Sequence, residues 1–288
     1  MNEENNTIYH RVTLNPMKIR QAATLNMNGC WWLYSIGIFI YYILLDVIIN
    51  IVSLYFPSGY LSLDMSQMSE ELQQYVSSGM KIPVLLLLYT LLMSGALILG
   101  RTIYTLMVLR NRVAIPRAMF EGFSGSGYFK ALLIYILREF LIGIGLMCFV
   151  IPGIILAYSY HQVFFALAEN GDRSVLECFR ESRRMMVGNK MTAFQLDLMY
   201  LPPILISYLP SYLLGSYGIA DTTTLGGILL YYLVQVPYFM TMGNYYMGQT
   251  VFYELILYGR FCDFKYQGED FFRKIDQSNR EDFTNGDE

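Results

Sequence analysis

The stretch that decides the fold is residues 131–168, ALLIYILREFLIGIGLMCFVIPGIILAYSYHQVFFALA. As one continuous helix it would extend nearly 60 Å at about 1.5 Å per residue, which is roughly twice the hydrocarbon thickness of a bilayer. Pro152 followed by Gly153 is the pair best suited to bend it. We therefore predict a helical hairpin that turns near Pro152, with a short apolar run over 153–168 as its second arm.

Other apolar runs flank this hairpin on both sides. A crossing needs about 20 mostly apolar residues, and four further runs meet that length. They cover residues 31–55, 83–109, 191–214 and 226–258. Pro202 and Pro203 interrupt the third of these runs, and Pro237 interrupts the fourth. The sequence therefore predicts an all-α, polytopic transmembrane helix bundle of about six spans, in which these prolines are candidate helix breaks.

The composition agrees with a membrane protein. The 288 residues are 55% hydrophobic and only 15% charged, whereas soluble domains carry about 25% charged residues. This deficit excludes an ordinary soluble enzyme and a disordered chain. The net charge of −3 excludes a strongly basic nucleic-acid-binding protein. We expect the lipid bilayer to surround the chain and no nucleic acid to bind it.

The basic residues indicate how the chain is threaded. Lys and Arg favour cytoplasmic loops, and they cluster before residue 31, over 110–130, over 173–190 and after 259. All four clusters lie inside if the hairpin returns to the side from which it started and both termini are cytoplasmic. The alternative is that 131–168 crosses once and continues as a surface helix, which would place the 173–190 cluster outside.

Three regions follow from this threading. Residues 1–30 form a cytoplasmic N-terminal segment with a short amphipathic helix that begins after Asn15. Residues 31–259 form the transmembrane domain. Residues 260–288 form a cytoplasmic tail, which is disordered over 276–288 because it lacks apolar periodicity.

A second cytoplasmic helix is predicted where the sequence SVLE begins at Ser174. The spacing of Ser174 and Glu177 matches a capping box, and Gly188 is well placed to end the helix. The helix is basic and amphipathic, which is typical of helices at a membrane surface. A plain connector whose arginines only enforce topology fits the same residues.

Ionisable groups inside membrane spans are costly, which makes them candidates for function. The candidates are Asp46, Arg101, Arg138, Glu139, His161, Asp197 and Glu254. One hypothesis is a buried polar cluster in which Arg101 and Arg138 face Glu139 and Asp197. Such a cluster serves as a structural ion-pair network, a substrate or proton pathway, or a site for lipid headgroups, and the sequence leaves these three open.

No sequence pattern points to catalysis or to a cofactor. The four cysteines (Cys30, Cys148, Cys178 and Cys262) form no CxxC pair, and His10 and His161 are the only histidines. We therefore expect free thiols and no metal site. The chain has no GxSxG or HExxH motif, and the glycine-rich loop over 122–127 matches no phosphate-binding pattern. We expect no cofactor and lean against an enzyme.

Residues 94–198 also carry a recognisable combination of motifs. A Phe-x-Gly-Phe element ends at Phe123, an Ile-Pro-Gly-Ile turn covers 151–154, and the sequence ESRRMMVGNK covers 181–190. This combination resembles a bacterial family of integral membrane proteins known as domain-of-unknown-function family 975. The resemblance implies a multi-spanning protein of the bacterial plasma membrane. It implies no activity, substrate or catalytic residue.

Three functions remain open from the sequence. In the first, the protein is non-enzymatic and binds or moves a small or lipid-like ligand, or supports envelope components, because interrupted spans line cavities in transporters. In the second, it is a membrane-embedded enzyme acting on lipid, with Asp46, Glu139 or Asp197 as acid or base. In the third, it is an immunity or stress adaptor that contacts a membrane-protein partner through the tail and the basic helix.

Overall fold

The computed structural model describes residues 9–55, 81–216 and 225–259, and within them the secondary structure is entirely helical. This confirms the all-α fold class. The elements are α1 (Pro16–Asn26), α2 (Trp31–Tyr55), α4 (Lys81–Asn111), η4 (Pro116–Phe123), α5 (Gly125–Cys148), α6 (Val150–Ser159), α7 (Val163–Glu169), α8 (Val175–Met185), α9 (Lys190–Ser216), α10 (Leu225–Val234) and α11 (Val236–Tyr258).

Three segments of the described chain are long and apolar enough to cross a membrane. They are Leu88–Asn111, Gly127–Cys148 and Val150–Glu169. A fourth is added if α1 and the described part of α2, which meet at a bend of 104°, count as one broken span. The protein therefore has the helices of a membrane protein, while the six spans predicted from the sequence are not established by these helices.

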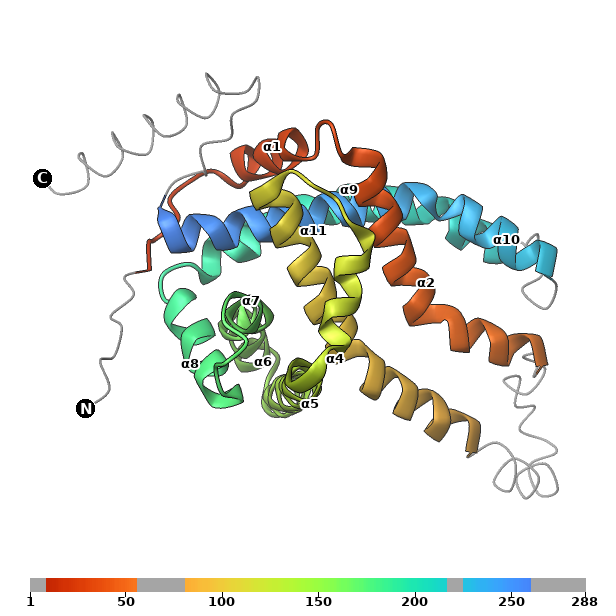
Figure 1. The fold of residues 1–288 in the computed structure, drawn as a ribbon, viewed down its shortest axis with the longest axis horizontal. Helices are drawn as coiled ribbons and strands as arrows, with labels where there is room; N and C mark the ends of the chain where they lie inside the picture. The colour runs from red at the N-terminus through yellow and green to blue at the C-terminus, as the bar shows by residue number, and fades with distance from the viewer. Residues whose placement is uncertain (1–8, 56–80, 217–224, 260–288) are drawn as a thin grey trace, which may run out of the picture.

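The helices do not all run in one direction (Figure 1). α9, α10 and α11 extend across the view, whereas α5, α6 and α7 are seen nearly end-on. Residues 55, 81, 216 and 225, at which described segments begin or end, lie toward one end of the molecule. Helix α8 lies toward the other end, together with residues 9 and 259. The hairpin arms therefore stand at a steep angle to α9 and α11.

The predicted hairpin forms, but it turns at Phe149 and not at Pro152. Phe149 is the single extended residue between α5 and α6. Pro152 and Gly153 lie in the first turn of α6. Proline lacks a backbone N–H, and at this position in a helix the loss costs no hydrogen bond. Gly153 allows the arms to touch, because a Cβ there would lie 2.5 Å from the Leu146 side chain. The pair thus shapes the return arm and does not itself make the bend.

The other predicted helix breaks have different outcomes. α9 continues through Pro202, Pro203 and Pro210 without interruption, because the proline φ angle suits a helix and membrane helices tolerate the lost hydrogen bonds. The prediction of a break at Pro202 and Pro203 is therefore wrong. At the last run the helix does break, at Gln235, and Pro237 occupies the first turn of α11.

The amphipathic helix α1 packs against protein and not against a free surface. Its Ile19, Ala22 and Ala23 are fully buried, and its contacts are with α11 and α9. Asn15 caps its first turn by accepting a hydrogen bond from the Met17 amide at 2.9 Å. At its other end, Arg112 donates to the Asn26 carbonyl at 2.6 Å. The Asn15 cap therefore stabilises the start of α1, and the Arg112 contact holds its other end against the segment that follows α4.

η4 packs unusually closely against α4. A Cβ at Gly100 would lie 1.8 Å from the carbonyl oxygen of Met119, and a Cβ at Gly122 would lie 2.0 Å from that of Ala96. Only glycine leaves room for such backbone contact. The Phe-x-Gly-Phe element therefore has a structural role, because it holds η4 against one face of α4.

The hairpin leaves much of its apolar surface exposed. Phe149, Val150 and Ile151 have exposed fractions of 75%, 64% and 72%, and Met147 reaches 90%. Water-exposed apolar patches of this kind are rare on soluble proteins, so this surface fits contact with lipid chains.

Some predictions lie outside the described residues. They concern the tail 260–288 with Cys262 and the side chain of Asp46. The capping box is confirmed, since Ser174 and Glu177 exchange both hydrogen bonds at the start of α8.

Candidate functional site

A cavity of about 270 Å³ lies where α2, α4, α5, α7 and α11 meet. Its polar lining includes Arg101, Arg138, His161 and Gln249, and Tyr41, Tyr245 and Tyr246 form an aromatic wall. No Asp or Glu lines it. Three residues predicted from separate apolar runs, the two arginines and the histidine, therefore face one space.

Arg101 lies near the middle of α4 and is held by tyrosines. Its guanidinium carbon is 3.7 Å from the ring centroid of Tyr246 and 5.1 Å from that of Tyr41. Its Nη1 also donates to the Tyr41 hydroxyl at 3.3 Å. No carboxylate among the described side chains forms an ion pair with it. Cation–π contact stabilises the guanidinium without neutralising its charge.

Arg138 comes from the middle of α5, and its charge is only partly compensated. Its Nη1 pairs with Glu139 Oε1 at 3.0 Å, and the Glu139 side chain is 48% exposed. Its buried Nε has no hydrogen-bond partner among the described residues. Arg101 lies close enough to repel it electrostatically. The cavity thus concentrates positive charge.

His161 lies in the turn between α6 and α7, where the return arm of the hairpin bends. Its Nδ1 is 3.2 Å from the side-chain nitrogen of Gln162. The Gln162 backbone amide donates to the Ser182 hydroxyl, which in turn donates to the Ser159 carbonyl at 2.9 Å. This chain of bonds fixes the position of the turn, and with it the histidine, against α8.

Asp197 does not pair with either cavity arginine. Its carboxylate accepts a hydrogen bond of 2.8 Å from the Tyr158 hydroxyl and one of 2.6 Å from Gln249 Nε2. Gln249 joins it to the cavity wall, and the Gln249 Oε1 is buried without a partner among the described residues. Of the pairs in the sequence hypothesis, only Arg138 with Glu139 forms in the structure.

Glu254 belongs to a different cluster. Its Oε1 lies 2.6 Å from Arg110 Nε, and the same guanidinium contacts Glu169 at 2.7 Å. The Tyr253 hydroxyl also donates to Glu169. This group joins the ends of α4, α7 and α11 and has the character of a structural ion-pair network.

Gln249, the tyrosine wall, and the part played by Arg110 and Glu169 were not predicted from the sequence. A glutamine inside an apolar run is a signal that could have identified Gln249. Arg110 and Glu169 lie next to loops in the sequence, and no local pattern indicates that they meet.

Residues 140–257 match a family model described as Protein of unknown function (DUF975). This segment belongs to the DUF975 family. The resemblance inferred from the motifs is thereby confirmed. The DUF975 segment includes His161, Asp197 and Gln249, whereas Arg101 and Arg138 precede it in the chain. No curated protein and no solved structure matches the chain.

Proposed function

We propose that the protein is a multi-spanning membrane protein that binds a small anion, carrying a phosphate or carboxylate group, in the basic cavity. The observation that carries the proposal is the pair Arg101 and Arg138, which line one cavity with no lining carboxylate. This proposal makes the protein a binding protein and assigns it no catalytic step.

The cost of buried charge favours an anionic ligand. A cation within a membrane span is several kcal/mol more costly than an apolar residue (about 2.5–3.5 kcal/mol at a helix centre). Glu139 compensates Arg138 only from a half-exposed position, and Arg101 has only tyrosines. An anion between the guanidiniums would supply the missing charge, and guanidinium geometry suits phosphate and carboxylate oxygens.

The size of the cavity limits the ligand. Pockets for drug-sized ligands measure roughly 300–1,000 Å³, and this one is about 270 Å³. It therefore fits a compact anionic group and not a whole lipid. The free Arg138 Nε needs an acceptor and the free Gln249 Oε1 needs a donor. A singly protonated phosphate offers both.

The membrane setting of the proposal rests on charge and on the hairpin. Because α5 and α6 fold back together, the basic segments before and after the hairpin stay on one side. We assign that side, with both termini, to the cytoplasm of a bacterium, because four basic clusters share it and because of the family resemblance. The hairpin then enters the bilayer from the cytoplasmic side.

The test is anion-dependent thermal stabilisation of the purified full chain in detergent. Phosphate, sulfate, acetate and chloride are compared at equal ionic strength. We expect phosphate to raise the melting temperature of the wild type and to have no such effect on Arg101→Gln or Arg138→Gln. Arg117→Gln removes a positive charge from an exposed position in η4 and should behave as wild type. Equal shifts in all four proteins would overturn the proposal.

A further inference from the structure

A second, larger cavity of about 770 Å³ opens between α6 and α8 on the surface of the protein. Its α6 wall is apolar at Ile155 and Leu156, and α8 contributes Leu176 and Phe179. Four basic residues complete it, namely Arg180, Arg183, Arg184 and Lys190. The basic groove, as we call it, thus combines an apolar floor with a cationic edge.

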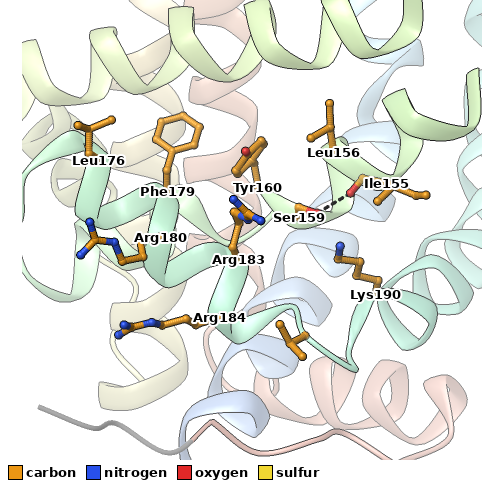
Figure 2. Close-up of a pocket in the computed structure, with 11 residues that line it drawn as sticks. Ile155, Leu156, Ser159, Tyr160, Leu176, Phe179, Arg180, Arg183, Arg184 and Lys190 are labelled. Carbon is orange, nitrogen blue, oxygen red and sulfur yellow. Dashed lines mark hydrogen bonds between the residues drawn. The ribbon is translucent and has the colours of Figure 1, made fainter. Parts of the chain in front are cut away.

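The basic groove carries an unbalanced positive charge. No carboxylate lines it. Arg184 contacts Glu181 at 3.5 Å, while Arg180, Arg183 and Lys190 form no ion pair within the described part of the chain. In Figure 2, Arg183 and Lys190 extend from α8 and the start of α9 toward the α6 wall, whereas Arg180 and Arg184 extend away from it. The side chains of Arg183 and Lys190 therefore point into the basic groove.

The apolar floor continues the lipid-facing surface of the hairpin. Ile155 is 48% exposed and lies on the same helix as the exposed Ile151 and Ile154. Leu176 on the opposite wall is 69% exposed, and Val187, which follows α8 and also lines the groove, is 75% exposed. An acyl chain that follows the α6 surface would enter the groove without leaving apolar contact.

We propose that the basic groove binds one anionic phospholipid, with its phosphate on Arg183 and Lys190 and its acyl chains along Ile155 and Leu156. Basic pockets between membrane helices on the cytoplasmic side recognise anionic headgroups in this way. The volume exceeds that of the central cavity nearly threefold and accommodates a headgroup with the start of its chains. This site is separate from the proposed anion cavity and does not depend on it.

The experiment is native mass spectrometry of the full chain released from nanodiscs that contain equal amounts of phosphatidylglycerol and phosphatidylcholine. We expect a one-to-one phosphatidylglycerol adduct on the wild type. A basic residue near the surface contributes about fivefold in affinity, so Arg183→Gln/Lys190→Gln should weaken the adduct about 25-fold. Arg117→Gln/Lys130→Gln removes the same charge elsewhere and should retain it.

A second variant and a crosslinking measurement complete the test. Ile155→Asn leaves the cations in place and should weaken the adduct by disturbing the acyl contact. Equal adducts on the double variant and its control, or no preference for phosphatidylglycerol, would overturn the proposal. So would a carbodiimide crosslink between Lys190 and a carboxylate of residues 260–288 in lipid nanodiscs, because the tail would then be the occupant.

Discussion

The guanidinium of Arg101 stacks over the ring of Tyr246, with 3.7 Å between the guanidinium carbon and the ring centroid. This contact places a full positive charge beside a cavity without giving it an opposite charge. It joins α4 to α11, which are distant in the sequence. The hydroxyl of Tyr246 is in turn 2.8 Å from that of Tyr42, so the ring is fixed in position.

The aromatic face of Tyr246, more than its hydroxyl, should hold Arg101. We predict that Tyr246→Leu lowers the free energy of unfolding by about 1–2 kcal/mol, the value of a desolvated cation–π contact. Tyr246→Phe keeps the ring and loses only the hydroxyl contact with Tyr42, so it should cost less. Thermal unfolding of the three proteins in one detergent checks this, and an equal loss in both variants would refute it.

Backbone contact between α4 and η4 should make two glycines irreplaceable. Gly100→Ala and Gly122→Ala force a Cβ against a backbone carbonyl, and overpacking of this kind costs about 1–3 kcal/mol or more. The control is Gly143→Ala in α5, where a Cβ meets nothing within 4 Å. It should be neutral or stabilise the helix by up to about 1 kcal/mol. If all three variants unfold at the same temperature, the close α4–η4 contact is wrong.

Asn189 should anchor the N-terminal segment. Its side chain accepts from the Val12 amide at 2.8 Å and donates to the His10 carbonyl at 3.0 Å and the Met185 carbonyl at 2.8 Å. Asn189→Ala leaves buried partners unsatisfied, which costs about 1–3 kcal/mol.

The readout is proteolysis of the N-terminal segment together with the melting temperature. We expect faster cleavage before residue 15 in Asn189→Ala. Asn28→Ala alters an exposed asparagine and should leave the cleavage rate unchanged. Equal cleavage of wild type and both variants would show that Asn189 does not anchor this segment.

Membrane sidedness can be read from single cysteines placed in a cysteine-free chain. Cysteines at Ser66 and Thr222 should react with an impermeant reagent added to intact cells, and those at Ser174 and Ser278 should not. Reaction at Ser174 would place α8 outside and contradict the assignment. Native Cys148 reports on the tip of the hairpin. Labelling of Cys148 would show that the hairpin crosses fully, and absence of labelling would show that its tip stays within the bilayer.

The sequence predicted those features that depend on neighbouring residues. The capping box at Ser174 and the cap at Asn15 follow from local spacing, and the hairpin follows from a run too long for one crossing. The turn was assigned to Pro152 and not to Phe149 because proline is equally compatible with a bend and with the first turn of a helix. The uninterrupted α9 was missed because helix packing decides whether proline breaks a membrane helix.

The candidate site was harder to predict because it depends on contacts between helices. The sequence identified Arg101, Arg138 and His161 from the cost of charge in lipid, and the structure brings them to one cavity. It paired Asp197 with arginine, whereas Asp197 is bound by the neutral donors Tyr158 and Gln249. Sequence position contains no information on which faces of α5, α9 and α11 meet.

The central claim is that Arg101 and Arg138 bind an anion, and equilibrium binding of radiolabelled phosphate to the purified full chain tests it most directly. We predict one saturable site per chain in the wild type and in Arg117→Gln. In Arg101→Gln and in Arg138→Gln, saturable binding should be lost while circular dichroism still shows folded protein. Absence of saturable binding in the wild type, or its retention in both cavity variants, would contradict the claim.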